Sequence, residues 1–241
     1  MPGLGTVINA AAIAVGGILG SICGGRLKER YRKTLNAACG VSVIFIGISG
    51  AMKYMLELDK NSPSGGGTML IVISLVLGGL LGEFLNIEGL FERLGEWLKE
   101  KSGSSGDSGF VNGFITASFT VCIGAMAVVG SIQDGLSGYL SVLCAKSVLD
   151  FIIIMVMTCS LGKGCIFASV PVLIFEGSIT CLAVFIKPIM TDAALAYLSL
   201  IGSVLIFCVG INITFGKKIN VANLLPSVVI AAAAAFLPFF R

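Results

Sequence analysis

The sequence consists mainly of apolar runs that are about as long as a membrane is thick. A helix needs roughly 20 apolar residues to cross the hydrocarbon core of a bilayer. Runs of about this length lie at 4–24, 35–57, 68–85, 110–130, 138–160, 164–186, 193–214 and 221–240. Lipid cannot hydrogen-bond to an exposed backbone, which excludes open sheets. The pattern therefore predicts an all-α polytopic membrane helix bundle of about eight transmembrane helices, surrounded by the lipid bilayer.

Composition agrees with this class and excludes several functions. Only 12% of the 241 residues are charged, and the mean hydropathy is +1.01, whereas soluble domains carry about 25% charged residues. Nucleic-acid binding needs a basic face on a folded domain, so no nucleic-acid partner is expected. The chain has no His, and its eight Cys lie in or beside apolar runs. No cofactor is therefore predicted, and the metal question stays open.

Lys and Arg are distributed unevenly between alternate loops. The loops after the first, third, fifth and seventh runs hold most of them, from Arg26 to Lys218. The opposite set holds Lys53, Lys60, Lys187 and Arg241. Because basic loops stay in the cytoplasm, this bias predicts a cell (plasma or inner) membrane protein with both termini outside.

A flexible Gly- and Ser-rich linker, 103–109, divides the chain into two membrane halves, 1–102 and 110–241. Just before the linker, apolar residues recur at helical spacing in 86–101, opposite charged ones. That pattern is typical of a helix lying in the membrane interface, with Trp97 at the level of the lipid headgroups.

Short repeats suggest duplicated hairpins. Gly16-Gly17-Ile18-Leu19-Gly20 recurs as Gly78-Gly79-Leu80-Leu81-Gly82, and 147–151 is similar to 203–207. The repeats relate odd-numbered runs, so we expect parallel-related hairpins; chance similarity between glycine-rich helices is the alternative. The pairs Gly16/Gly20 and Gly78/Gly82 are typical of helix-packing surfaces. Such faces also make a second copy of the chain a candidate partner, as a homodimer.

Three ionisable residues interrupt the fifth and sixth runs. Asp150 and Glu176 are equally far along the chain from Lys163, which lies in the turn between the runs. If both runs are antiparallel helices, the two carboxylates lie at one depth, roughly 20 Å from the turn. Lys146 lies one helical turn before Asp150, on the same face. We therefore expect the three groups to meet inside the membrane.

The charges of this set do not balance. If all three groups ionise, their sum is −1, which a low-dielectric interior does not tolerate. Glu176 must then take a proton, hold a cation or face water, and its oxygen ligands suit a hard cation. Asn9, Asn212 and Thr180 are further candidates for the same ion or solute site. The alternative is a static, hydrogen-bonded triad that locks one hairpin together.

Enzymatic activity is not predicted. Gly47-Ile48-Ser49-Gly50 is similar to the serine motif of intramembrane proteases, but that chemistry needs a general base, normally His. An aspartyl protease needs two aspartates in helices, whereas Asp134 falls in an expected turn at 131–135.

Several segments together resemble one protein family. They are 5–9, 124–136 (GAMAVVGSIQDGL), 145–150 (AKSVLD), 171–174 with 177–180, and 223–226. They are similar to the YqgA/YdfK-type bacterial inner-membrane proteins over nearly the whole chain. The resemblance implies a multi-pass membrane protein of unassigned function. The hairpin 149–177 is also faintly similar to MntP/LysE-type exporters, which implies cation export, although those proteins have six helices.

The preferred hypothesis is a small polytopic transporter or channel for a small ion or solute. Asp150 and Glu176 would form its central site, linked to a proton or a cation, and Lys146 would tune their charge. The alternative is a non-transporting membrane scaffold that binds a partner through its glycine faces and the helix 86–101.

Overall fold

A computed structural model describes residues 3–24, 28–61, 66–104, 106, 108–122, 125–188 and 190–236. Helices joined by short turns make up this part of the chain, and it contains no strand. The predicted all-α polytopic bundle is confirmed. Parts of the expected loop 61–67 and of the linker 103–109, together with Arg26 and Arg241, lie outside the described residues.

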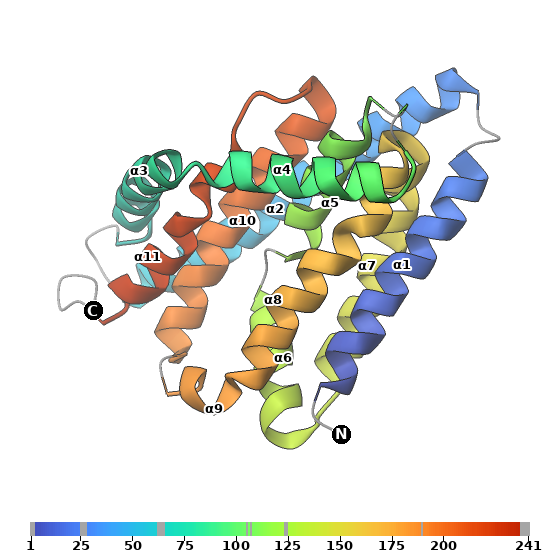
Figure 1. The fold of residues 1–241 in the computed structure, drawn as a ribbon. Coiled ribbons are helices and arrows are strands. Elements are labelled where there is room, and N and C mark those ends of the chain that lie inside the picture. Colours follow the sequence, from blue (N-terminus) through green and yellow to red (C-terminus); the bar gives the residue numbers. More distant parts are fainter. Residues whose placement is uncertain are drawn as a thin grey trace.

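Each apolar run of the sequence corresponds to helical structure. In chain order the elements are α1 (Leu4–Gly24), α2 (Glu29–Asn61), α3 (Gly66–Leu85), α4 (Ile87–Lys101), α5 (Phe110–Cys122), α6 (Ala125–Ser137), α7 (Ser141–Leu161), η1 (Lys163–Ala168), α8 (Ser169–Cys181), α9 (Ala183–Ile186), α10 (Asp192–Phe215), η2 (Val221–Leu224) and α11 (Pro226–Ala234). Figure 1 shows most of the long helices running between two ends of one bundle.

The number of spans is smaller than the number of apolar runs. Among the described residues, six helices are long and apolar enough to cross a membrane, or seven if the bent pair α5–α6 counts as one span. The two helices of that pair meet at 63°. The described part of the last run holds a shorter apolar helix over 221–234, which starts with a 3-10 turn before Pro226.

The outside of the bundle is apolar. Phe45, Leu80, Phe84, Phe185 and Val229 are each at least 66% exposed. Exposed apolar area on this scale is costly in water and marks a surface that contacts lipid or another protein. The exterior therefore fits the hydrocarbon core of a bilayer.

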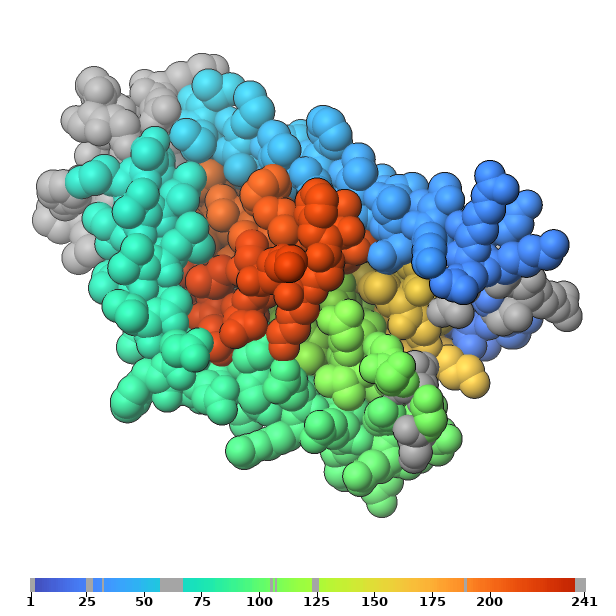
Figure 2. Space-filling view, turned by 90° about the horizontal axis from the view of Figure 1, so that it is seen from above, coloured from blue at the N-terminus to red at the C-terminus, as the bar shows by residue number. Residues whose placement is uncertain are grey.

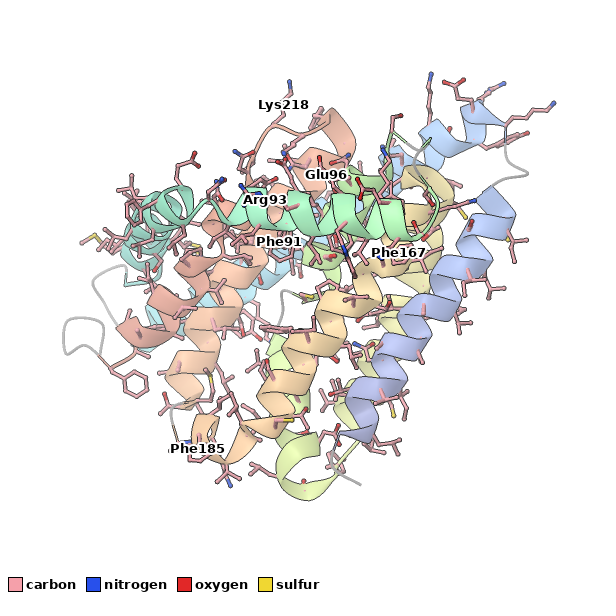
Figure 3. All side chains as sticks on the ribbon, viewed as in Figure 1. Phe91, Arg93, Glu96, Phe167, Phe185 and Lys218 are labelled. Atoms are coloured by element: carbon pink, nitrogen blue, oxygen red, sulfur yellow. The ribbon has the colours of Figure 1, made fainter. Side chains whose placement is uncertain are left out.

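Helix α4 lies across one end of the bundle (Figure 1). Its start is capped by the side chain of Asn86, which accepts a hydrogen bond from the Gly89 backbone. Leu98 is buried and Phe91 packs toward the core, while Arg93 and Glu96 point away from it (Figure 3). Trp97 is 53% exposed. The predicted amphipathic helix is thus present at this position.

We call this end of the bundle the α4 end and the opposite end, where α1 begins, the far end. Figure 2 looks down on the α4 end, where α2, α3 and α4 surround the orange-red segment of η2 and α11. Lys218 also lies here, whereas Phe185 lies at the far end (Figure 3). Lys217 forms ion pairs with Glu88 and Glu92 of α4 and so lies at the α4 end as well. The basic residues at the start of α2 belong to its helix rather than to the expected loop.

Helices from before and after the linker pack together. Helix α1 runs along α7, and α2 runs along α10. The boundary at 103–109 therefore separates the halves along the chain, while their helices interleave in space.

Two hairpins share a local design. Gly162 follows the last residue of α7 and Gly216 follows the last residue of α10, with φ of 100° and 79°, values that favour glycine. Each glycine is followed by a 3-10 helix and then by a helix that holds a proline, Pro171 or Pro226. The similar segments 147–151 and 203–207 lie on these same two helices, α7 and α10. The internal repeat itself stays a prediction.

The glycines expected at packing surfaces lie at close helix contacts. Gly16 and Gly20 meet the backbone of α7, and Gly78 meets the backbone at Ser227 of α11. Gly82 meets Asn223 of η2 in the same way. A side chain at any of these positions would collide with backbone atoms, so the glycines permit the helices to approach.

Replacing Gly20 with Ala should destabilise the fold by about 1–3 kcal/mol, because the added methyl would meet Thr158 Cβ at 2.9 Å and the Met155 carbonyl. Gly177→Ala is the matched control, since a Cβ there would meet only Thr6 Cγ2, at 4.0 Å. It should be neutral or gain up to about 1 kcal/mol of helix propensity. Thermal unfolding of both variants in detergent checks this; equal midpoints would contradict the packing argument.

Candidate functional site

The hairpin of α7 and α8 brings the three predicted ionisable residues together. Lys146 forms an ion pair with Asp150 on its own helix, and its Nζ lies 3.4 Å from Oε1 of Glu176 on α8. The three residues are 6%, 5% and 0% exposed, respectively. The two carboxylates therefore face one shared ammonium group in the interior and do not point toward lipid.

A backbone carbonyl completes the surroundings of Lys146. Its Nζ donates to the Val121 carbonyl oxygen at 2.8 Å. Because α5 ends at Cys122, this carbonyl belongs to the last turn, whose carbonyls have no partner within the helix. The C-terminal end of a helix also carries partial negative charge. Lys146 thus caps α5 inside the bundle, a role that no side-chain pattern in the sequence indicated.

Asn9 joins the cluster from α1. Its Nδ2 donates to Glu176 Oε1 at 2.9 Å, and both residues are 0% exposed. Two oxygens of this contact, Asn9 Oδ1 and Glu176 Oε2, are buried without a hydrogen-bond partner. Buried polar atoms are nearly always paired, so two orphans on touching side chains mark a place where something else can bind.

Polar contacts continue from this cluster toward the far end. Thr180 lies one helical turn beyond Glu176 on α8, and its Oγ1 is 3.2 Å from that of Thr6 on α1. Thr180 also donates to the Ser131 carbonyl of α6 at 3.3 Å. The Ser131 hydroxyl is buried without a hydrogen-bond partner. We call Thr6, Ser131 and Thr180 the polar seam.

The position of Asp134 differs from the one predicted from the sequence. The sequence predicts a turn at 131–135, but Asp134 lies within α6 and is 0% exposed. Its carboxylate accepts from the backbone of Gly3 at 3.1 Å and of Gly5 at 2.9 Å, and it thereby caps the start of α1. A carboxylate at a helix N-terminus is stabilising. Asp134 therefore fixes α1, and with it Asn9, against α6.

Asn212 does not join the cluster, which is a second correction. Its Nδ2 donates to the Ile219 carbonyl at 2.7 Å, and its Oδ1 accepts from the backbone of Lys218 and Ile219. The amide thus holds the loop after α10 at the α4 end. The prediction that Asn212 belongs to the site was wrong, because one polar residue in an apolar run gives no indication of its partner.

A polar cavity of about 260 Å³ lies beside Asn212 at the α4 end. Its lining includes Glu88 and Glu92 of α4, Thr116 of α5 and Lys217. Lys217 Nζ lies 3.0 Å from Glu88 and 2.7 Å from Glu92. Burial disfavours the charged form of Lys217, but these two partners outweigh it and raise its pKa above the ordinary value.

A second, apolar cavity of about 480 Å³ lies between α4, α5, α8 and α11. Phe119 and Cys122 of α5 contribute to its wall, near the α5–α6 break. Neither cavity is lined by Lys146, Asp150 or Glu176.

Comparison with known proteins places the chain in a family. Residues 4–236 match the family described as "Protein of unknown function (DUF554)". The chain belongs to this family. It is 28% identical over 232 residues to the uncharacterized protein YqgA of Escherichia coli (strain K12), covering 95% of this chain and 94% of that protein. The uncharacterized membrane protein YdfK of Bacillus subtilis (strain 168) is also 28% identical over 232 residues, covering 96% and 95%.

These matches confirm the family resemblance of the sequence and agree with a membrane protein of several helices. No solved structure matches the chain significantly. The faint likeness of the hairpin 149–177 to MntP/LysE-type exporters stays a prediction.

Replacing Lys146 with Met should destabilise the protein by about 3–5 kcal/mol, because Asp150 and Glu176 would then be buried without their cation. Removing all three charges together, with Lys146→Met, Asp150→Asn and Glu176→Gln, should recover most of this loss. Lys187→Met is the control at an exposed position. Thermal unfolding in detergent measures all of these variants. A single Lys146→Met variant as stable as the parent would mean that the three charges are not coupled.

Proposed function

We propose that this protein is a small multi-pass transporter or channel for a small ion or solute. Its central site is the cluster of Lys146, Asp150, Glu176 and Asn9, which we call the buried cluster. The observation that carries the proposal is one buried ammonium group facing two buried carboxylates, one of which keeps an unpartnered oxygen.

The charge of the buried cluster supports this function over a purely structural one. A balanced pair, Lys146 with Asp150, would be enough to pin α7 to the end of α5. Glu176 adds a further acid, and an isolated charge in a dry interior is expensive. Ionisable groups inside membrane segments are rare and mark ion pathways and proton relays. A ligand that binds at Glu176 and dissociates again therefore explains why the cluster has this second acid.

The surroundings of the buried cluster offer an approach from each end. The polar seam leads from Glu176 toward the far end. Toward the α4 end, α5 connects Val121 at the cluster with Thr116 at the polar cavity, roughly 7.5 Å along the helix axis. The break between α5 and α6 lies beside the cluster, and broken helices commonly form binding sites in secondary transporters.

We further place the α4 end on the cytoplasmic side of the inner membrane. Lys218 lies there (Figure 3), and Lys217 pairs with Glu88 and Glu92 of α4. Helix α2 also begins there, with Arg30 and Lys33 in its first turns, and basic segments stay in the cytoplasm. On this orientation α1 begins outside, and the polar seam is the outer approach to the cluster.

A flux assay in proteoliposomes tests the proposal. Vesicles that hold the purified protein and a pH-sensitive dye are given a membrane potential, and proton movement and uptake of radioactive sodium are followed. The parent protein should exceed protein-free vesicles in at least one of the two signals. Asp150→Asn and Glu176→Gln should reduce that signal to the protein-free level, because each removes one of the two carboxylates.

Glu96→Gln is the matched control, since it removes a carboxylate from an exposed position on α4. It should keep the parent's flux. Unchanged flux in both cluster variants would remove the cluster from the mechanism, and an absence of both signals in the parent would count against transport of these ions.

The scaffold hypothesis is the second candidate, and the outer face of α4 favours it. Leu90 and Trp97 are more than half exposed on this helix, where a partner could bind them. This hypothesis predicts that the Leu90→Gln and Trp97→Gln variants fail to complement a deletion of the gene, whereas Glu176→Gln complements it. The transport proposal predicts the reverse order of effects.

A further inference from the structure

We infer that Asn9 and Glu176 form a binding site for a monovalent metal cation that has shed part of its water. The inference rests on the buried cluster of the proposed function and names the class of ion that it holds. The contact between the two side chains lies where α1 crosses α8, and both residues are fully buried.

The charge count selects a monovalent ion. Lys146 and Asp150 neutralise each other through their ion pair. Glu176 then contributes a single negative charge, so one monovalent cation makes the cluster neutral. A divalent cation would leave a net charge of +1 next to the Lys146 ammonium group, 3.4 Å from Glu176. An unbalanced charge of that kind is as costly in the interior as the one that it replaces.

The available ligands select a hard alkali cation. Glu176 Oε2 and Asn9 Oδ1 are the two oxygens of this contact that have no hydrogen-bond partner. Carboxylate and amide oxygens are ligands of hard cations, whereas softer transition metals favour imidazole and thiolate. The described part of the chain contains no group of three or more His, Cys, Asp or Glu residues placed to hold a metal ion together. Lys146 has only donors and repels the ion, which confines it to the Asn9 side of Glu176.

The polar seam supplies the next oxygens along α1 and α8. Thr6 and Thr180 lie one turn toward the far end, and the buried Ser131 hydroxyl beside them has no hydrogen-bond partner. An ion leaving Glu176 would therefore meet hydroxyl and carbonyl oxygens before it reached the end of the bundle. Such a series of weak sites lowers the barrier for a partly dehydrated ion.

A proton is the rival occupant, because it would also neutralise Glu176. The two occupants differ in what a salt exchange does at constant pH. A bound alkali cation stabilises the folded protein in proportion to the logarithm of its concentration above Kd. A proton on Glu176 makes stability independent of whether sodium, potassium or choline balances the chloride.

The test is thermal unfolding of the purified full chain in detergent, in sodium, potassium or choline chloride at one pH and one ionic strength. Sodium or potassium should raise the unfolding midpoint by several degrees over choline, and the rise should grow with concentration. Glu176→Gln and Asn9→Ala should lose this dependence. The control Glu96→Gln should retain it. Equilibrium binding of radioactive sodium or of rubidium, as a potassium substitute, provides a second measurement where a variant is too unstable to unfold reversibly.

The outcomes separate this inference from the proposed function. Equal stability of the parent in all three salts, with no bound radioactive ion, overturns the cation site. Proton flux that depends on Glu176 would leave the transport proposal standing in that case. Cation binding without flux would support the site and overturn transport. Cation dependence that survives in both Glu176→Gln and Asn9→Ala would place the ion elsewhere and overturn the inference.

Discussion

The ammonium group of Lys146 is the contact that links several helices in the interior of the bundle. It pairs with Asp150 on α7, faces Glu176 on α8 and caps the last turn of α5 through the Val121 carbonyl. Glu176 extends the network to Asn9 on α1. Four helices therefore depend on one buried charge, and its cost of burial is met only while these partners stay in place.

The packing around the buried cluster follows from this requirement. Helix α1 can bring Asn9 to Glu176 because glycines let its C-terminal half lie against the α7 backbone, and because Asp134 holds its first turn. Helix α5 must stop at the depth of Lys146 for its carbonyl to be free, and the chain bends there into α6. Irregular backbone at membrane depth is tolerated only where the protein satisfies it. The break and the buried lysine thus stabilise each other.

The same arrangement divides the buried cluster into a fixed and a variable part. Lys146 and Asp150 satisfy each other on one helix, so their relation does not change if α8 shifts. Glu176 and Asn9 sit on two different helices and keep unpartnered oxygens. A small displacement of α1 against α8 would open or close this contact without breaking the ion pair. That division is the physical basis for assigning the structural role to one acid and the ligand-binding role to the other.

The sequence by itself determined the class of protein, the amphipathic helix α4 and the meeting of Lys146, Asp150 and Glu176. Lipid forces helices on long apolar runs, and within one hairpin helical rise fixes which residues share a depth. Only the tertiary structure decided that Asn9 joins them, that Asn212 braces a loop at the α4 end, that Asp134 caps α1 and that Val121 receives the lysine. Periodicity describes one helix at a time, and the choice of a distant partner depends on how all helices pack. A backbone carbonyl is the same in every residue, so no sequence pattern could have indicated the one at Val121.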